Sequence, residues 1–95
     1  MVADAYVIFF RPEVEGDIRG LGRGAQQKIL RAIKQRLTQS PEKYGKPLGG
    51  SLRGLRRIRT GHYRIAYQVQ KRKVLVWAVL HRRTIYAEME KRCRE

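Results

Sequence analysis

The sequence predicts a small α+β domain, in which an N-terminal strand and a helical hairpin pack on a mainly antiparallel sheet. β-Branched and aromatic residues gather near the N-terminus and again in the second half of the chain, which is typical of strands. Between them, apolar residues recur at spacings of three and four, which is typical of amphipathic helices. The 95 residues are enough for one domain and too few for two, so we expect a single domain over residues 1–95.

The first elements are a strand and a short helix. Residues 5–10, AYVIFF, are predicted to form the strand. Pro12 follows and suits the first turn of a helix, whose N-terminus favours nearby negative charge. The apolar stripe of this helix is Val14, Ile18 and Leu21, and its acids are Glu13, Glu15 and Asp17.

A second helix is expected over residues 25–38, after the glycine-rich segment 20–24, and Ser40-Pro41 ends it. The two helices therefore form a hairpin. Ile29, Ile33 and Leu37 form the apolar stripe of the second helix, and we interpret Lys28, Arg31, Lys34 and Arg36 as a solvated face.

The second half of the chain is predicted to form three short strands, after a loop at residues 41–50 that is rich in glycine, proline and lysine. The order β-α-α-β-β-β with a short C-terminal helix indicates the α+β class. The strands are expected at about 52–59, 62–70 and 73–80, with turns at Thr60-Gly61 and Lys71-Arg72 and a partly folded helical tail at 83–92.

Charge is the dominant compositional feature. The chain has 22 Lys and Arg against 8 Asp and Glu, a formal net charge of +14. No acid occurs from Lys43 to Ala87, whereas a surface built for solubility mixes both signs. Because such a molecule repels itself, we expect it to bind a polyanion, an acidic partner protein or both.

Several protein classes are excluded by what the sequence lacks. No apolar run approaches the roughly 20 residues that cross a bilayer, and no signal-peptide pattern is present, so we expect a cytoplasmic protein without a membrane partner. No carboxylate, Cys or His set has metal-ligand spacing, and Cys93 is the only cysteine. We therefore expect no metal and no cofactor.

Alternation along the strands is expected to gather arginines on one face of the sheet. Like charges opposed across an antiparallel pair are unfavourable, so a sheet that accepts them usually holds an anion there. With Thr60-Gly61 as the turn, the pairs are Arg59 with His62, Ile58 with Tyr63, and Arg57 with Arg64. Ile58, Tyr63, Ile65 and Tyr67 would then share the apolar face, and Arg57, Arg59, His62 and Arg64 the basic face.

The third strand and the tail are expected to extend the basic face. Tyr86 follows Arg82 by four residues and can reach the arginines if the tail curls back. Since the guanidinium fork matches phosphate oxygens, the cluster predicts a phosphate-binding site. With Lys71-Arg72 as the turn, Gln70 pairs with Lys73, Arg64 with Val79 and His81 with His62.

Other aromatic and apolar residues are interpreted mainly as packing residues. Leu75, Trp77 and Val79 would lie on the arginine-bearing face, as core beneath a loop or the tail. The alternative is a docking surface for a partner helix or for an RNA base stacked on Trp77. Tyr44, Tyr63 and Tyr67 are interpreted as packing residues.

Two segments carry a resemblance to a known family: LRRIRTGHYRIAYQV at 55–69 and VLHRRTIY at 79–86. With them, and with its element order over nearly the whole chain, the sequence resembles the RelE/ParE superfamily of bacterial and archaeal toxins. The Gly-x-Tyr-Arg-x-x-Tyr hairpin is shared by both branches, whereas the His-Arg-Arg-x-x-Tyr ending favours the RelE branch. The resemblance implies one RelE-like domain.

The resemblance also implies a toxin of a type II toxin–antitoxin system. RelE-like proteins are metal-independent endoribonucleases that cleave messenger RNA in the ribosomal A site and so inhibit translation. The implied partners are a cognate RelB-like antitoxin, the ribosome and mRNA. For the cations of the second helix, antitoxin or ribosomal RNA contact is then an alternative to solvation.

The implied chemistry is attack of a ribose 2′-hydroxyl on its adjacent phosphate. Arg64 and Arg82 would stabilise the developing charge. His81 is a candidate acid or base, and Tyr86 would stack on a base, orient the 2′-hydroxyl or remove its proton. Arg57 and Arg59 stand where the best-studied RelE pattern has lysines; because arginine stays protonated, they are assigned to charge stabilisation. RNA binding is expected of Arg53, Arg56, His62 and Arg83.

Two other functions fit the sequence. A ParE-like protein would poison DNA gyrase without catalysis of its own, and purified gyrase would then accumulate double-strand breaks. A toxin fold with decayed activity would keep only RNA or partner binding, which would show steep salt dependence without cleavage.

Overall fold

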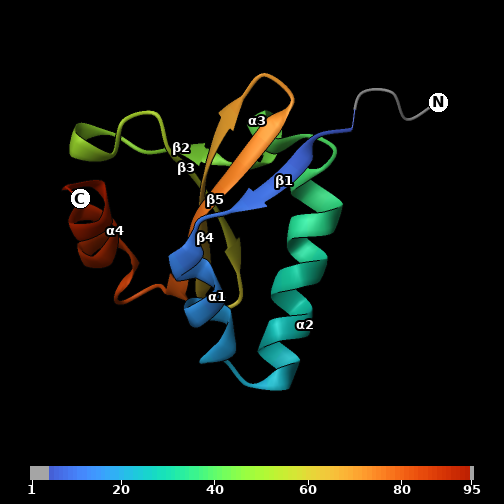
Figure 1. Ribbon diagram of the computed structural model, residues 1–95, viewed down its shortest axis with the longest axis vertical. Helices are drawn as coiled ribbons and strands as arrows, with labels where there is room; N and C mark the ends of the chain where they lie inside the picture. The colour runs from blue at the N-terminus through green and yellow to red at the C-terminus, as the bar shows by residue number, and fades with distance from the viewer. Residues whose placement is uncertain (1–4, 95) are drawn as a thin grey trace.

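The computed structural model describes residues 5–94 and contains a five-stranded mixed sheet with helices on both faces (Figure 1). The strand order is β1-β5-β4-β3-β2. β1 is parallel to β5 and the other neighbours are antiparallel, so the predicted α+β class and mainly antiparallel sheet are confirmed. The strands are β1 (Val7–Phe10), β2 (Lys46–Pro47), β3 (Arg56–Thr60), β4 (Tyr63–Gln70) and β5 (Lys73–His81).

The predicted helical hairpin packs on one face of the sheet. It consists of α1 (Pro12–Arg19) and α2 (Arg23–Ala32), which continues into a π-helical turn, η1 (Ile33–Leu37). No helix within residues 5–94 has the length and apolar character needed to cross a membrane. The hairpin and the sheet bury a common core of Val14, Ile29, Ala32, Ile33, Leu37, Ile58, Ile65, Tyr67, Val74, Val76 and Val79.

The opposite face is partly covered by the C-terminal helix α4 (Ile85–Arg94). The sequence predicted only partial folding here, which is wrong, because α4 buries Ile85 and Met89 against the sheet and thereby gains the packing that stabilises helices in proteins. The second core consists of Leu52, Leu55, Ala66, Ala78, Ile85 and Met89.

The segment predicted as a loop at 41–50 contains α3 (Pro41–Tyr44) and β2, and a 3-10 turn, η2 (Gly50–Leu52), follows. The segment folds over Tyr67, whose hydroxyl donates to the Pro41 carbonyl oxygen at 2.5 Å. A Cβ on Gly45 would lie 1.7 Å from that hydroxyl oxygen, so only glycine fits. Tyr44 is 57% exposed, so its predicted packing role is wrong, whereas Tyr63 and Tyr67 do pack in the core.

The hairpin between β3 and β4 turns one residue later than predicted. Gly61 has a φ of +61°, which glycine adopts without strain, and Thr60 pairs with Tyr63. The predicted pairs Arg59–His62, Ile58–Tyr63 and Arg57–Arg64 are therefore wrong. The observed pairs are Arg59 with Arg64, Ile58 with Ile65, and Arg57 with Ala66.

A bulge interrupts the ladder between β4 and β5. Gln70 pairs with Lys73 as predicted, but Tyr67 pairs with Val76 and Ala66 with Ala78, which leaves Trp77 as an extra residue. Beyond it the predicted pairs Arg64–Val79 and His62–His81 are wrong. Arg64 pairs with Leu80, Tyr63 pairs with His81, and Val79 faces the helical hairpin instead of sharing a face with Leu75.

Candidate phosphate-binding site

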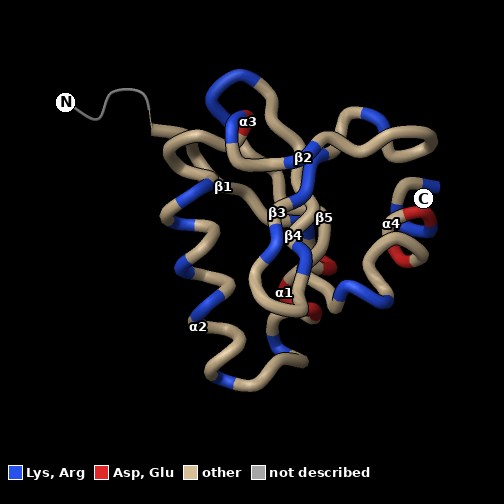
Figure 2. The backbone as a smooth tube through the Cα atoms, turned by 180° about the vertical axis from the view of Figure 1, so that it is seen from behind, with Lys and Arg blue, Asp and Glu red and all other residues tan. Residues whose placement is uncertain are grey.

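Arginines from three segments meet on the face of the sheet that α4 partly covers. Arg57 and Arg59 are two residues apart on β3, so their side chains lie on the same face of the sheet. Arg59 lies directly opposite Arg64 of β4. Arg82 follows β5, and its backbone N–H donates to the His62 carbonyl at 2.8 Å. We call Arg57, Arg59, Arg64 and Arg82 the arginine cluster. Figure 2 shows Lys and Arg on β3 and β4, whereas the Asp and Glu residues between positions 5 and 94 all lie on α1, α3 and α4.

Arg64 is the electrostatic centre of the arginine cluster. Partial burial lowers the pKa of its guanidinium first, and the charges of Arg59, Arg57 and Arg82 lower that pKa further. Its Nη1 donates to the carbonyl oxygens of Gly61 and Tyr63, both at 3.0 Å. Among residues 5–94, no carboxylate pairs with an arginine of the cluster. The cluster therefore presents unneutralised positive charge to a ligand.

Tyr86 stands at the edge of the cluster, in the first turn of α4. Its hydroxyl oxygen accepts a hydrogen bond from Arg57 Nε at 2.9 Å, and the residue is 41% exposed. The neighbouring Ile85 is buried against the sheet and fixes the start of the helix. The tyrosine hydroxyl thus lies against the arginine cluster, and the side chain is accessible there.

His81 ends β5, where it pairs with Tyr63 and contacts the Tyr63 ring. The bulge therefore places His81 on the helical side of the sheet, at the end of the strand, and not on the face of the arginine cluster as predicted. Its Nδ1 accepts the backbone N–H of Arg83 at 3.1 Å, so the neutral ring carries its hydrogen on Nε2. The pKa of His81 is lowered, and partial burial is the largest cause. Electrostatic repulsion adds to it, from Arg83, His62, Arg82 and Arg64. The rings of His62 and His81 stack with centroids 5.9 Å apart. Near neutral pH, His81 therefore offers an N–H donor.

Two of the predicted RNA-binding residues lie outside the arginine cluster. Arg56 projects from the other face of β3, where its Nη2 donates to the carbonyls of Glu42 and Gly45, each at 2.6 Å. Arg53 is exposed between η2 and β3. Since Arg56 holds the segment over Tyr67, its geometry indicates a structural role. His62 and Arg83 lie next to His81: the His62 ring stacks on it, and the backbone N–H of Arg83 donates to its Nδ1.

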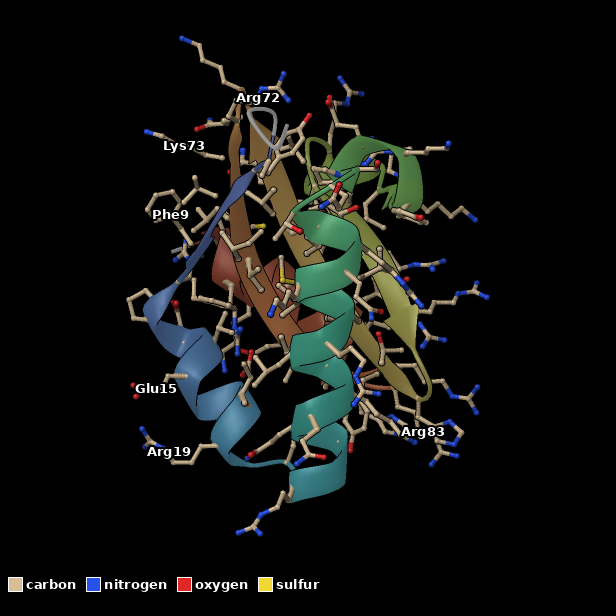
Figure 3. All side chains as sticks on the ribbon, turned by 90° about the vertical axis from the view of Figure 1, so that its right-hand side faces the viewer. Phe9, Glu15, Arg19, Arg72, Lys73 and Arg83 are labelled. Atoms are coloured by element: carbon tan, nitrogen blue, oxygen red, sulfur yellow. The ribbon has the colours of Figure 1, made fainter. Side chains whose placement is uncertain are left out.

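A separate apolar groove lies along β1 and β5. Its volume is about 410 Å³, it is lined by Phe9, Phe10, Leu75, Gln68, Gln70 and Lys73, and Phe9 is 47% exposed. Trp77 is half-buried near the second core, with the Arg11 guanidinium carbon 4.0 Å from the centre of its ring. Figure 3 shows Phe9 and Lys73 on one side of the molecule and Arg83 on the other.

One pair of charged residues, Asp17 and Arg92, was not predicted from the sequence. They form an ion pair with an Oδ1–Nη2 distance of 2.8 Å, although they are 75 positions apart. The available signal was the position of each charge on an apolar stripe. Asp17 follows Val14 by three residues and Arg92 follows Met89 by three, which places both on buried helix faces.

The arrangement suits the binding of a phosphodiester. Guanidinium groups bind phosphate oxygens through paired hydrogen bonds, and here they lie beside the Tyr86 hydroxyl, with the His81 imidazole near the end of β5. Within residues 5–94, no three His, Cys, Asp or Glu side chains gather in a group that could hold a metal ion. The groups on hand are thus suited to charge stabilisation and proton transfer.

Comparison with protein families places this arrangement in context. The profile described as "ParE toxin of type II toxin-antitoxin system, parDE" matches residues 8–86, which include the whole arginine cluster and Tyr86. None of the curated proteins matches the chain.

Solved toxin structures share the fold. A chain of the toxin–antitoxin complex RelBE2 from Mycobacterium tuberculosis has a TM-score of 0.77 and 25% identity, covering 81% of this chain and 98% of that one. The isolated RelE toxin of E. coli has a TM-score of 0.66 and 26% identity, covering 93% and 98%. A chain of the ParDE system of P. aeruginosa, at 13% identity and a TM-score of 0.65 over 83% and 98%, shares the fold alone.

Proposed function

The chain belongs to the ParE toxin family of type II toxin–antitoxin systems, and from this premise we propose that it is a toxin that cleaves messenger RNA on the ribosome. The family includes members with different targets, so the choice of target depends on the site. The observation that carries the proposal is a cluster of arginines, beside Tyr86, that pair with no carboxylate in the described part of the chain. Identity also supports this target, since the matched chains of the RelE and RelBE structures are 22–26% identical to this chain and the ParDE chain is 13% identical.

The proposed reaction is attack of a ribose 2′-hydroxyl on the adjacent phosphorus, which releases the 5′-oxygen of the next nucleotide. Negative charge builds up on the phosphorane oxygens during this step. Arg64 and Arg82 stabilise that charge, and Arg59 adds to the local positive potential. Such electrostatic stabilisation is commonly the largest single contribution to catalysis. A catalytic role would therefore account for a cluster of arginines that repel one another.

Tyr86 and His81 are assigned to the two hydroxyl groups of the reaction. Because Arg57 Nε donates to the Tyr86 hydroxyl oxygen, that oxygen keeps a second lone pair, which accepts a hydrogen bond from the 2′-hydroxyl and orients it. The proton that the 2′-hydroxyl loses passes to water. His81 carries its hydrogen on Nε2 and donates a hydrogen bond from it to the departing 5′-oxygen, which takes its proton from water. His62 and Arg83 lie close enough to contact the neighbouring nucleotides.

The second proposed partner is an acidic antitoxin. The matched solved structures include RelB–RelE complexes from E. coli, Methanococcus jannaschii and Pyrococcus horikoshii. A net charge of +14 favours a protein of opposite sign. The groove at Phe9 and Leu75 is apolar, and Lys73 also lines it. We propose that apolar side chains of the antitoxin bind in this groove.

Translation with purified ribosomes tests the proposed function. We expect programmed mRNA to be cut within the codon in the A site, and the same mRNA without ribosomes to stay largely intact. Arg53→Ala, which removes an arginine outside the cluster, is the matched control and should cut normally. Equal cutting of naked RNA, or binding to ribosomes with no cutting at all, would contradict the proposal.

A second candidate function is inhibition of DNA gyrase. The observation that favours it is the family profile itself, which is that of the ParE toxin. Purified gyrase with supercoiled DNA separates the two targets. Trapped double-strand breaks together with intact mRNA would establish the gyrase target, and cut mRNA with normally supercoiled DNA the ribosomal one.

A further inference from the structure

The far end of the C-terminal helix is joined to α1 by a buried ion pair. Arg92 Nη2 donates to Asp17 Oδ1 at 2.8 Å, and Arg92 Nη1 donates to Asp17 Oδ2 at 2.9 Å. The side chains are only 8% and 7% exposed. The Asp17 carboxylate raises the pKa of Arg92 above its usual value, and Glu88 accepts from Arg92 Nε at 3.1 Å. A bidentate pair of this kind fixes direction as well as distance.

The same two side chains complete the edge of β5 beyond the end of β1. The last residue of β5 that pairs with β1 is Val76. Past it, Asp17 Oδ2 accepts the backbone N–H of Val79 at 3.0 Å, and Arg92 Nη1 donates to the Trp77 carbonyl at 2.9 Å. The ion pair thus takes the place of a neighbouring strand, and each partner satisfies a backbone group that would otherwise be orphaned.

The helix that carries Arg92 also carries the tyrosine of the site. Tyr86 precedes Arg92 by six residues, about 9 Å along an α-helix. The buried residues of α4 are Ile85, Met89 and Arg92. Apolar contacts are non-directional, so Ile85 and Met89 hold the helix on the sheet but leave its angle free. Three contacts between side chains of α4 and side chains of other elements are directional: the exposed hydrogen bonds Arg57–Tyr86 and Ser51–Glu90, and the Arg92–Asp17 pair. Of these, the Arg92–Asp17 pair is the buried and bidentate one.

We propose that Asp17 and Arg92 are positioning residues that set the angle of α4 and thereby hold Tyr86 against Arg57. The proposal rests on the proposed function, because the orientation of Tyr86 affects a reaction only if the arginine cluster binds the scissile phosphate. The ion pair acts through the helix and touches no substrate. Its loss therefore changes the chemical step and leaves phosphate binding by β3 and β4 intact.

Single-turnover cleavage on programmed ribosomes tests this assignment with Arg92→Met, which keeps an unbranched apolar side chain at the position. We expect the saturating rate to fall up to about 10²-fold, the loss that a displaced group can cause. KM should stay within about twofold, because ground-state binding is unchanged. Lys91→Met is the matched control: it removes an exposed cation of the same helix and should leave both parameters at wild-type values.

A second readout does not depend on cleavage. In the free protein, nuclear Overhauser contacts between the Tyr86 ring and the Arg57 side chain report the position of the helix. We expect these contacts in the wild type and in Lys91→Met, and their loss in Arg92→Met while the amide signals of the sheet persist. If Arg92→Met does not fold, Asp17→Asn, which keeps an acceptor for the Val79 N–H, is measured in its place and should weaken the same contacts.

The two readouts separate the two proposals. A wild type that cuts no mRNA yet loses the Tyr86 contacts on substitution of Arg92 would refute the proposed function and retain the positioning role. A folded Arg92→Met protein with wild-type Tyr86 contacts and a wild-type cleavage rate would overturn the positioning role.

Discussion

The molecule uses arginine in two opposite ways. Arg92 is buried, and Asp17, Glu88 and the Trp77 carbonyl occupy its donors. Arg64 is half-buried among other arginines and donates only to backbone carbonyls of its own turn. A guanidinium with a carboxylate partner stabilises the fold, whereas one held beside like charges raises the energy of the fold until an anion binds. The difference separates structural cations from functional ones.

Asp17→Ala should give the largest change in stability. It leaves Arg92 buried without its carboxylate, so we expect the free energy of unfolding to fall by about 3–5 kcal/mol. Urea denaturation measures this. Glu15→Ala is the matched control on the same helix, since Glu15 pairs with Arg19 at the surface, where such pairs contribute about 0–1 kcal/mol. If both variants lose the same free energy of unfolding, the buried ion pair stabilises the fold no more than the exposed one.

Arg64→Ala and Arg82→Ala should show the reverse pattern. Each removes charge stabilisation from the proposed site, so ribosomal cleavage should fall by about 10²–10³-fold, the usual loss for one electrostatic donor. Stability should be unchanged or slightly higher, because like-charge repulsion is relieved. The two measurements are cleavage rate and urea midpoint. Variants that unfold, or that cut mRNA at the wild-type rate, would show that these arginines are structural.

The salt dependence of RNA binding sharpens the comparison further. Each phosphate contact on a single strand contributes about −0.7 to the slope of log K against log salt. Arg59→Gln should therefore make the slope shallower by about that amount. Arg31→Gln, on the exposed face of α2, should leave the slope unchanged if that face is only solvated. If Arg31→Gln alone makes the slope shallower, the RNA-binding surface lies on α2 and not on the arginine cluster.

The smallest expected effect is the pH dependence associated with His81. The folded protein lowers the pKa of this imidazole below its usual value of 6.5, so the unfolded chain binds more protons between the two values. Stability should therefore rise with pH through that window and level off above 6.5. Unfolding of the wild type and of His81→Asn at several pH values measures this. If the stability of His81→Asn depends on pH as steeply as that of the wild type, His81 is not the cause of the pH dependence.

The fold was predictable because its elements have local signals. Residues 5–10 carry strand-forming side chains, and the stripe of Ile29, Ile33 and Leu37 is helical. The short elements within 41–50 were missed because they depend on a distant residue, Tyr67, over which the segment folds. Tertiary contacts of this kind leave no local pattern.

The arginine face was predicted correctly although the register was wrong. Moving the turn by one residue, from Thr60-Gly61 to Gly61-His62, shifts every pair by two positions and leaves each side chain on its face. The bulge at Trp77 had the opposite effect, since one extra residue transferred Val79 to the helical side. Alternation therefore predicts faces reliably only as far as the next bulge.

The limits of the site prediction concern residues whose partners are remote in sequence. Arg56 was predicted to bind RNA like the other arginines near β3. In the structure its guanidinium donates to the carbonyls of Glu42 and Gly45 on the other face of the sheet. Asp17 and Arg92 gave only the signal of a charge on an apolar stripe. Which acid meets which base depends on how α1 and α4 cross β5, and that is a property of the fold.

The most direct test of the account is an NMR titration of the arginine side chains with a short RNA that carries a 2′-deoxy sugar and cannot be cut. We predict that the Nε–H signals of Arg57, Arg59, Arg64 and Arg82 shift together, and that the signal of Arg92 stays in place. Shifts confined to Arg31 and Arg36 of the second helical segment, or no shift in the cluster at low salt, would contradict the claim that the arginine cluster on this sheet binds a phosphate.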